Sequence, residues 1–76
     1  MEAYVMIKVE AGKTSKVLAA LRKLPKVRQA NACFGLADII GFVEAADEKD
    51  LGEFVFGKIH ALPGVVETNT HVVFEA

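Results

Sequence analysis

The stretch Phe34-Gly35-Leu36-Ala37-Asp38 lies at the centre of the 76-residue chain, with one strand-helix-strand pattern on each side of it. Gly35 can adopt a positive φ angle at little cost, so the stretch suits a tight turn between antiparallel strands. We therefore interpret it as a hairpin that joins two similar halves. The same stretch contains Asp38, a candidate ligand-binding residue.

The spacing of apolar residues divides the chain into strands and helices. Alternation places successive side chains on opposite faces and predicts a strand, whereas apolar residues three or four positions apart predict a helix. A proline directly after a helical pattern ends the helix. The predicted strands are residues 4–10, 27–33, 38–44 and 65–75, and the predicted helices end at Leu24 and Leu62, before Pro25 and Pro63.

Polar residues mark the start of each predicted helix. A side-chain oxygen at this position can accept a free backbone N–H of the first turn. Thr14 or Ser15 is expected to cap the first helix, and Asp47 the second. The acidic residues that follow Asp47 suit the positive end of the helix dipole. Gly52 and Gly57 lie inside the second helix, and each weakens it by about 1 kcal/mol relative to alanine.

The two halves resemble each other in sequence. Leu24-Pro25-Lys26-Val27 matches Leu62-Pro63-Gly64-Val65, and Tyr4-Val5 matches Phe42-Val43. Chance similarity between short elements is the alternative to an internal repeat. Two β-α-β units, each split to admit a strand of the other, form a ferredoxin-like fold. We therefore predict one α+β domain over residues 1–76, a ferredoxin-like βαββαβ fold whose four-stranded antiparallel sheet has the order 4-1-3-2 and both helices on one face.

The other face of this predicted sheet has no helix to cover it. Tyr4, Met6, Ile40 and Phe42 are expected to point to that face. Burying each of these side chains contributes about 1.5–3 kcal/mol, and an exposed apolar patch usually marks an interface. A chain this short buries only about 60% of its unfolded surface. We therefore predict a homodimer in which two sheets pack face to face through these residues.

Charge and composition limit the classes of partner. The formal net charge is −1, with 9 basic and 10 acidic residues, whereas a DNA-binding domain usually has a basic surface. No signal-peptide pattern follows Met1, and no apolar run approaches the ~20 residues of a membrane span. Cys33 is the single cysteine, which suits a reducing compartment. We expect a cytoplasmic protein that contacts neither nucleic acid nor membrane directly.

Patterns typical of catalysis or metal binding are not apparent. His60, His71 and Cys33 lack the spacing of a zinc site, and Gly35 is not part of a phosphate-binding loop. The prediction is a protein that is not an enzyme and that uses no metal and no cofactor. One alternative stays open, a small dimeric α+β barrel enzyme acting as an isomerase or cofactor-free oxygenase. Its acid or base would be one of those three residues or Asp38.

Two polar features interrupt the apolar strands. Asp38 lies where the hairpin opens into a strand, and Thr68 and Thr70 share one face of the last strand. A carboxylate can bind an ammonium group, and hydroxyls with backbone N–H groups can bind a carboxylate, so together they could hold an amino-acid zwitterion. The alternative is structural: Asp38 would accept hydrogen bonds from turn amides, and the threonines would simply favour strand geometry.

The order of these motifs resembles the effector-binding domain of Lrp/AsnC transcription regulators, also called the RAM domain. The resemblance covers nearly the whole chain, and it is carried by Tyr4-Val5-Met6-Ile7-Lys8-Val9, Leu24-Pro25-Lys26-Val27, Gly35-Leu36-Ala37-Asp38, Leu62-Pro63-Gly64-Val65 and Thr68-Asn69-Thr70. It implies a ferredoxin-like domain that dimerises through its sheets and assembles further, often into octamers. It also implies that small amino acids bind between dimers.

The resemblance also assigns residues to the site and a function to the chain. Phe34 and Ala37 depart from the family, which often has threonine before the glycine and an aromatic residue before the aspartate. The chain resembles the form of the domain that lacks the helix-turn-helix. The implied function is a non-catalytic module for amino-acid sensing and oligomerisation that could modulate full-length regulators, and a purely structural oligomerisation module is the alternative. The implied ligand-binding residues are Gly35, Leu36, Asp38, Thr68 and Thr70.

Overall fold

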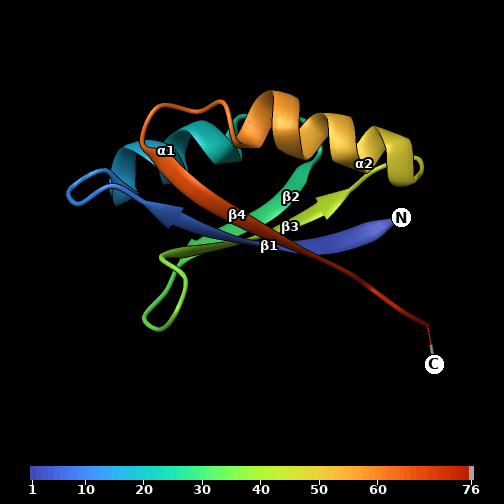
Figure 1. Ribbon diagram of the computed structural model, residues 1–76, viewed down its shortest axis with the longest axis horizontal. Helices are drawn as coiled ribbons and strands as arrows, with labels where there is room; N and C mark the ends of the chain where they lie inside the picture. The colour runs from blue at the N-terminus through green and yellow to red at the C-terminus, as the bar shows by residue number, and fades with distance from the viewer. Residues whose placement is uncertain (76) are drawn as a thin grey trace.

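The computed structural model describes residues 1–75, and Ala76, the last residue of the predicted domain, lies outside the described residues. Every strand pairing is antiparallel, and the strand order is β2-β3-β1-β4, which is the predicted order read from the other edge. Figure 1 shows both helical segments on the same side of the sheet. The predicted ferredoxin-like α+β fold is confirmed. Its elements are β1 (Glu2–Val9), α1 (Thr14–Arg22), β2 (Val27–Ala32), β3 (Ile39–Glu44), α2 (Glu48–Phe54), the π-helix η1 (Val55–Ile59) and β4 (Val65–Val72).

The core lies between the sheet and the helical segments. In β1, Val5 and Ile7 are fully buried, whereas Tyr4, which alternates with them along the strand, is 49% exposed. The alternation seen in the sequence therefore separates a covered face from an uncovered one. From the sheet and from the helices, the fully buried side chains include Val5, Ile7, Ile39, Val43, Val17, Leu21 and Ile59.

The first helix begins differently from the prediction. Its N-cap is Lys13, no side chain caps it, and Thr14 is already its first residue. Lys13 closes a turn in which its N–H donates to the Glu10 carbonyl, and its own carbonyl accepts the first helical hydrogen bond from Val17. The helix therefore starts before either Thr14 or Ser15 can cap it, and that prediction is wrong.

The second helical segment agrees with the prediction only at its start. Asp47 caps α2, where its carboxylate accepts a hydrogen bond of 2.8 Å from the Asp50 N–H. The later half is a π-helix, in which the His60 N–H donates to the Val55 carbonyl, so the prediction of one continuous α-helix is wrong. Val55 and Ile59 are buried, as an α-helix would also bury them, so apolar spacing cannot separate the two geometries. Within residues 1–75, neither helical segment has the length and apolar character that crossing a membrane requires.

The turns after the two helical segments show the internal repeat. The Val27 N–H donates to the Leu24 carbonyl at 3.1 Å, and the Val65 N–H donates to the Leu62 carbonyl at 3.1 Å. The second turn also packs more closely. Gly64 has a φ of 100°, and a Cβ there would lie 3.1 Å from side-chain carbons of α1 and its cap. A glycine is therefore required at this turn for both backbone angle and space.

The last strand is shorter than predicted. It ends at Val72 rather than at residue 75. Its partner β1 begins at Glu2, and the final backbone contact is the hydrogen bond of 2.8 Å from the Val73 N–H to the Glu2 carbonyl. Beyond this point β1 offers no further partner, so the ladder stops although the apolar pattern continues.

Candidate functional site

The uncovered face of the sheet carries the residues predicted to form a dimer interface. Tyr4 lies opposite Phe42, and Met6 lies opposite Ile40, so the four side chains are neighbours on one surface. The rings of Tyr4 and Phe42 have centroids 4.9 Å apart. A hollow of about 500 Å³ lies over this surface and reaches β2. The prediction that these residues share an uncovered face is confirmed, and the dimer itself stays a prediction.

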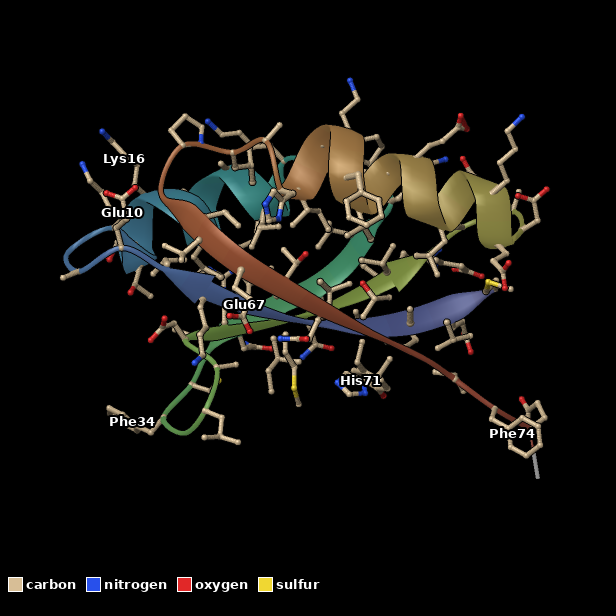
Figure 2. The ribbon with its side chains drawn as sticks, viewed as in Figure 1. Glu10, Lys16, Phe34, Glu67, His71 and Phe74 are labelled. Carbon is tan, nitrogen blue, oxygen red and sulfur yellow. The ribbon has the colours of Figure 1, made fainter. Side chains whose placement is uncertain are left out.

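The hairpin between β2 and β3 projects from the sheet on the side away from the helices (Figure 1). The Cys33 N–H donates to the Asp38 carbonyl at 3.0 Å and closes the loop, and Gly35 has a φ of 137°, as a tight turn requires. Phe34 and Leu36 at the tip are 106% and 91% exposed. Figure 2 shows Phe34 at the end of this loop, pointing away from the sheet. The predicted turn thus presents two apolar side chains without cover.

Asp38 is held by the backbone of β1. Its N–H donates to the Ile7 carbonyl at 3.0 Å, and its Oδ2 accepts a hydrogen bond of 2.9 Å from the Val9 N–H. The carboxylate thereby extends the β1–β3 ladder beyond Ile39, the first residue of β3, in the place of a main-chain carbonyl. An ionised carboxylate has further lone pairs, so it can still accept from an ammonium group. The hollow beside it, of about 430 Å³, is lined by Thr14, Ala32, Cys33 and Phe34.

Thr68 and Thr70 lie on the helix side of β4. Their partners on β1, Ile7 and Val5, are fully buried in the core. Both threonines line a groove of about 310 Å³ between β4 and the second helical segment. Thr68 Oγ1 also lies 3.4 Å from Nδ1 of His60. The apolar wall of this groove consists of Leu51, Val55 and Phe56.

One chain does not bring the five predicted ligand-binding residues together. Ile39, Ile7 and Thr68 lie side by side across β3, β1 and β4. Asp38 and Thr68 are therefore two strand spacings apart, roughly 10 Å, with the fully buried Ile7 between them. Leu36 lies over a third hollow, of about 210 Å³, on the uncovered side. Within one chain, the hairpin carboxylate and the two threonines therefore belong to separate parts of the surface.

Sequence reasoning missed the polar residues of β4 that face the uncovered side. Asn69 Nδ2 donates to Glu67 Oε2 at 2.9 Å, and Figure 2 shows His71 on the side of the sheet away from the helices. Their position could have been predicted from the sequence, because they alternate with the two threonines and successive side chains of a strand point to opposite faces of the sheet. The third hollow is lined by Met6, Lys8, Leu36, Ala37, Glu67, Asn69 and His71.

Comparison with known proteins identifies the family. Residues 2–76 match the Lrp/AsnC ligand-binding domain. The chain belongs to this family. Domains of the Lrp/AsnC family usually oligomerise and bind effectors, and they are typically non-catalytic.

Individual Lrp/AsnC relatives resemble the chain over its whole length. The HTH-type transcriptional regulator FL11 of Pyrococcus horikoshii is 31% identical over 75 residues, which cover 99% of this chain and 49% of the regulator. The chain therefore spans about half of that relative. The crystal structure of FFRP-DM1 is 32% identical with a TM-score of 0.91, covering 96% of this chain and 97% of that one. The crystal structure of TTHA0845 from Thermus thermophilus is 28% identical with a TM-score of 0.93, covering 99% and 94%.

Among the residues considered as acids or bases in this Lrp/AsnC domain, the two histidines lie apart from Cys33 and Asp38. Cys33 is at the base of the hairpin, where its thiol donates to the Ala37 carbonyl at 3.3 Å. His60 follows η1 on the helix side, His71 lies on the uncovered side of β4, and both are exposed. General acid–base catalysis needs such groups within hydrogen-bond reach of one reacting atom. Cys33 and Asp38 line the same hollow beside the hairpin, whereas His60 and His71 are not part of its lining.

The pKa of Asp50 is shifted, although this residue lines none of these hollows. The backbone N–H of Ala46, 2.9 Å from the Asp50 carboxylate, and Lys26 Nζ, 3.1 Å from it, lower the pKa of Asp50 below its usual 3.8. Lys26 precedes β2 and Asp50 lies in α2. The ion pair therefore links the two halves of the fold and lines none of the hollows described above.

Proposed function

We propose that this Lrp/AsnC domain is a non-catalytic module that senses an amino acid and changes its assembly in response. The observation that carries the proposal is the match of residues 2–76 to a ligand-binding domain. The chemistry of the polar residues supports an amino acid as the ligand. The Asp38 carboxylate can bind an ammonium group, and the hydroxyls of Thr68 and Thr70 can bind a carboxylate.

The first step of assembly in this proposal is a dimer formed by the uncovered faces. Tyr4, Met6, Ile40 and Phe42 would leave water there, and each contributes about 1.5–3 kcal/mol on full burial. The hairpin projects on the same side of the sheet (Figure 1). In a face-to-face dimer it would reach past the sheet of the partner, which supplies a surface for the exposed Leu36.

The effector site in this proposal lies between copies of the chain. One copy contributes the hairpin, with Gly35, Leu36 and Asp38, and another contributes the groove that holds Thr68 and Thr70. The separation of these groups within one chain supports this arrangement. The wall of the groove favours an amino acid with an apolar side chain, since it consists of Leu51, Val55 and Phe56.

Sensing requires that the ligand bind one assembly more tightly than another, because a ligand with equal affinity for both does not shift the equilibrium between them. A site completed by two copies meets this requirement directly. The same interfaces would let the chain assemble with full-length regulators of its family and so modulate them.

Calorimetry against the twenty amino acids, combined with sedimentation, tests the proposal. We expect at least one amino acid with an apolar side chain to bind and to change the sedimentation profile. Asp38→Asn separates binding from folding, because the amide oxygen can still accept the Val9 N–H while the charge that would hold an ammonium is gone. Its affinity should fall roughly tenfold or more, the effect of about 1.5–3 kcal/mol for a hydrogen bond to a charged group. No binding across the panel and an unchanged assembly would instead leave a purely structural oligomerisation module.

A further inference from the structure

The two outer strands of the sheet present different edges. On β2, the Ala30 carbonyl accepts two hydrogen bonds from the Arg22 guanidinium, from Nε at 3.1 Å and from Nη2 at 2.8 Å. A side chain of α1 thus occupies that edge. On the other side, β4 pairs with β1, and no further strand of residues 1–75 follows it in the sheet. Figure 1 looks onto this second edge, where β4 crosses in front of the other strands.

The register shows which backbone groups of β4 point outwards. The Val73 N–H donates to the Glu2 carbonyl, and the β1–β4 pairing is regular from Glu67 onward. In an antiparallel ladder, alternate residues bond to a given neighbour. The N–H and C=O groups of Thr68, Thr70 and Val72 therefore point away from β1. Within residues 1–75, no other backbone group pairs with them.

We propose that this edge pairs with β4 of a second copy of the chain, antiparallel and about a two-fold axis at Asn69. The outward N–H and C=O groups of Thr68 and Thr70 then have partners, as in any antiparallel ladder. In this register Thr68 lies opposite Thr70 of the second copy on the helix side. Threonine pairs of this kind are favourable across antiparallel strands.

The exposed side chains of β4 are complementary to themselves in this register. On the uncovered side, Glu67 lies opposite His71 of the second copy, and the two-fold axis repeats the pair. An imidazole N–H can donate to a carboxylate whether or not the ring is charged. On the helix side, Val66 lies opposite Val72 of the second copy, and both are about half exposed in the single chain.

Neighbouring registers lack this complementarity. A shift of two residues sets Glu67 opposite Asn69 in one direction and opposite Val73 in the other. A shift of four residues in the first direction sets Glu67 opposite Glu67 of the second copy, and like charges directly opposite are destabilising. The pairing of β4 with itself is therefore defined in register as well as in partner.

This contact goes beyond the proposed function, because it names a specific interface that needs no ligand. It joins two sheets into one continuous sheet and leaves the uncovered faces of both available. The groove that holds Thr68 and Thr70 opens beside this edge. Pairing therefore changes the mouth of the groove. A ligand that binds the groove more tightly in one of the two states can then shift the equilibrium between the single and the paired chain.

Disulfide trapping without any ligand tests the register. In a Cys33→Ser background, Asn69→Cys places a thiol on the proposed axis. Residues that face each other at such non-hydrogen-bonded positions have Cα atoms about 4.5 Å apart, which a disulfide can span. Under mild oxidation we expect Asn69→Cys chains to form covalent dimers.

Two further cysteine variants serve as matched controls. Glu67→Cys alone should give no covalent dimer, because position 67 of one copy is four residues along the strand from that of the other. A mixture of Glu67→Cys chains with His71→Cys chains should give the mixed dimer. Equal cross-linking of Asn69→Cys and Glu67→Cys, or none with Asn69→Cys, would overturn the proposal. Because no ligand is used, that result would leave the sensing proposal standing.

Amide hydrogen exchange provides a second readout. At high protein concentration, the amides of Thr68 and Thr70 should exchange roughly tenfold more slowly than on dilution, although no backbone group of residues 1–75 pairs with them within one chain. His71→Glu sets two carboxylates against each other and should abolish this protection, while Glu67→His combined with His71→Glu should restore it. Rapid exchange of both amides at every concentration contradicts the pairing.

Discussion

The two faces of strand β1 both carry apolar side chains, but their surroundings differ. Val5 and Ile7 are fully buried beneath the helices, whereas Tyr4 on the opposite face is 49% exposed. The difference teaches that one strand can serve two purposes. The covered face supplies the stability of the single chain, and the uncovered face is available for contact with another surface.

The largest expected effect lies on the covered face. Ile7→Ala removes a fully buried side chain and leaves a cavity, so it should lower the free energy of unfolding by about 2–5 kcal/mol. Urea unfolding measures this change. Met6→Ala, one position earlier on the uncovered face, is the matched control and should cost less than half as much in dilute protein. Equal losses from the two variants would remove the distinction between the faces.

The corresponding change on the uncovered face should alter assembly rather than folding. Phe42→Glu places a charge in the proposed interface, and it should shift the sedimentation profile to the monomer while circular dichroism stays unchanged. The expected loss is at least the burial of one large apolar side chain, about 1.5–3 kcal/mol. Lys16→Glu, on the exposed side of α1, introduces the same carboxylate and should leave the assembly intact. A dimer that survives Phe42→Glu would contradict the role given to this face.

Two variants of Asp38 separate the effect of its hydrogen bond from that of its charge, at the point where the ladder between β1 and β3 ends. Asp38→Ala removes the acceptor of the Val9 N–H and should lower the free energy of unfolding by about 1–3 kcal/mol. Asp38→Asn keeps an acceptor and should cost clearly less. Thermal unfolding at one fixed protein concentration compares the two. If both variants lose the same stability, the charge rather than the hydrogen bond holds this end of the ladder.

The helices that cover the buried face differ in how they begin. Asp47→Ala removes the side-chain cap of α2 and should cost about 0.5–2 kcal/mol. Thr14→Ala is the control in α1, which has no side-chain cap, and its effect should be within a few tenths of a kcal/mol. Denaturant midpoints measure both. A larger loss from Thr14→Ala would show that the first helix relies on this hydroxyl after all.

The smallest effect concerns the partly exposed ion pair between Lys26 and Asp50, which links the two halves. The backbone N–H of Ala46 and the Lys26 ammonium lower the pKa of Asp50 below its usual 3.8. The stabilisation is therefore complete above pH 3.8 and disappears as the pH falls through the lowered pKa. Lys26→Ala should raise the pKa of Asp50 towards 3.8 in an NMR titration, and Lys16→Ala should not change it.

Much of the fold is predictable because its signals are local. The alternation around Ile7 and the prolines at 25 and 63 fix the type and order of the elements, and the repeat then fixes the sheet order. The hydrogen bonds that set the start of α1 and the geometry of η1 are harder to predict from local sequence. Lys13 begins α1 because of a turn back to Glu10, and η1 has the same apolar pattern as an α-helix.

The candidate site was less predictable, because it depends on register between distant strands. The Asp38 carboxylate accepts from Val9, 29 positions away in the sequence. The strand between Asp38 and Thr68 carries Ile7, and only the pairing of β3, β1 and β4 shows this separation. The sequence identified residues with the right chemistry, but not that one chain keeps them apart.

The guanidinium of Arg22 on the Ala30 carbonyl also limits how far the sheet can extend. A sheet with two open edges can add copies at both ends and grow into a fibre. Here the β2 edge is blunted, so a pairing through β4 closes on itself after a single step, as two-fold contacts do. Arg22, which lines none of the hollows described above, thus protects the chain against open-ended polymerisation.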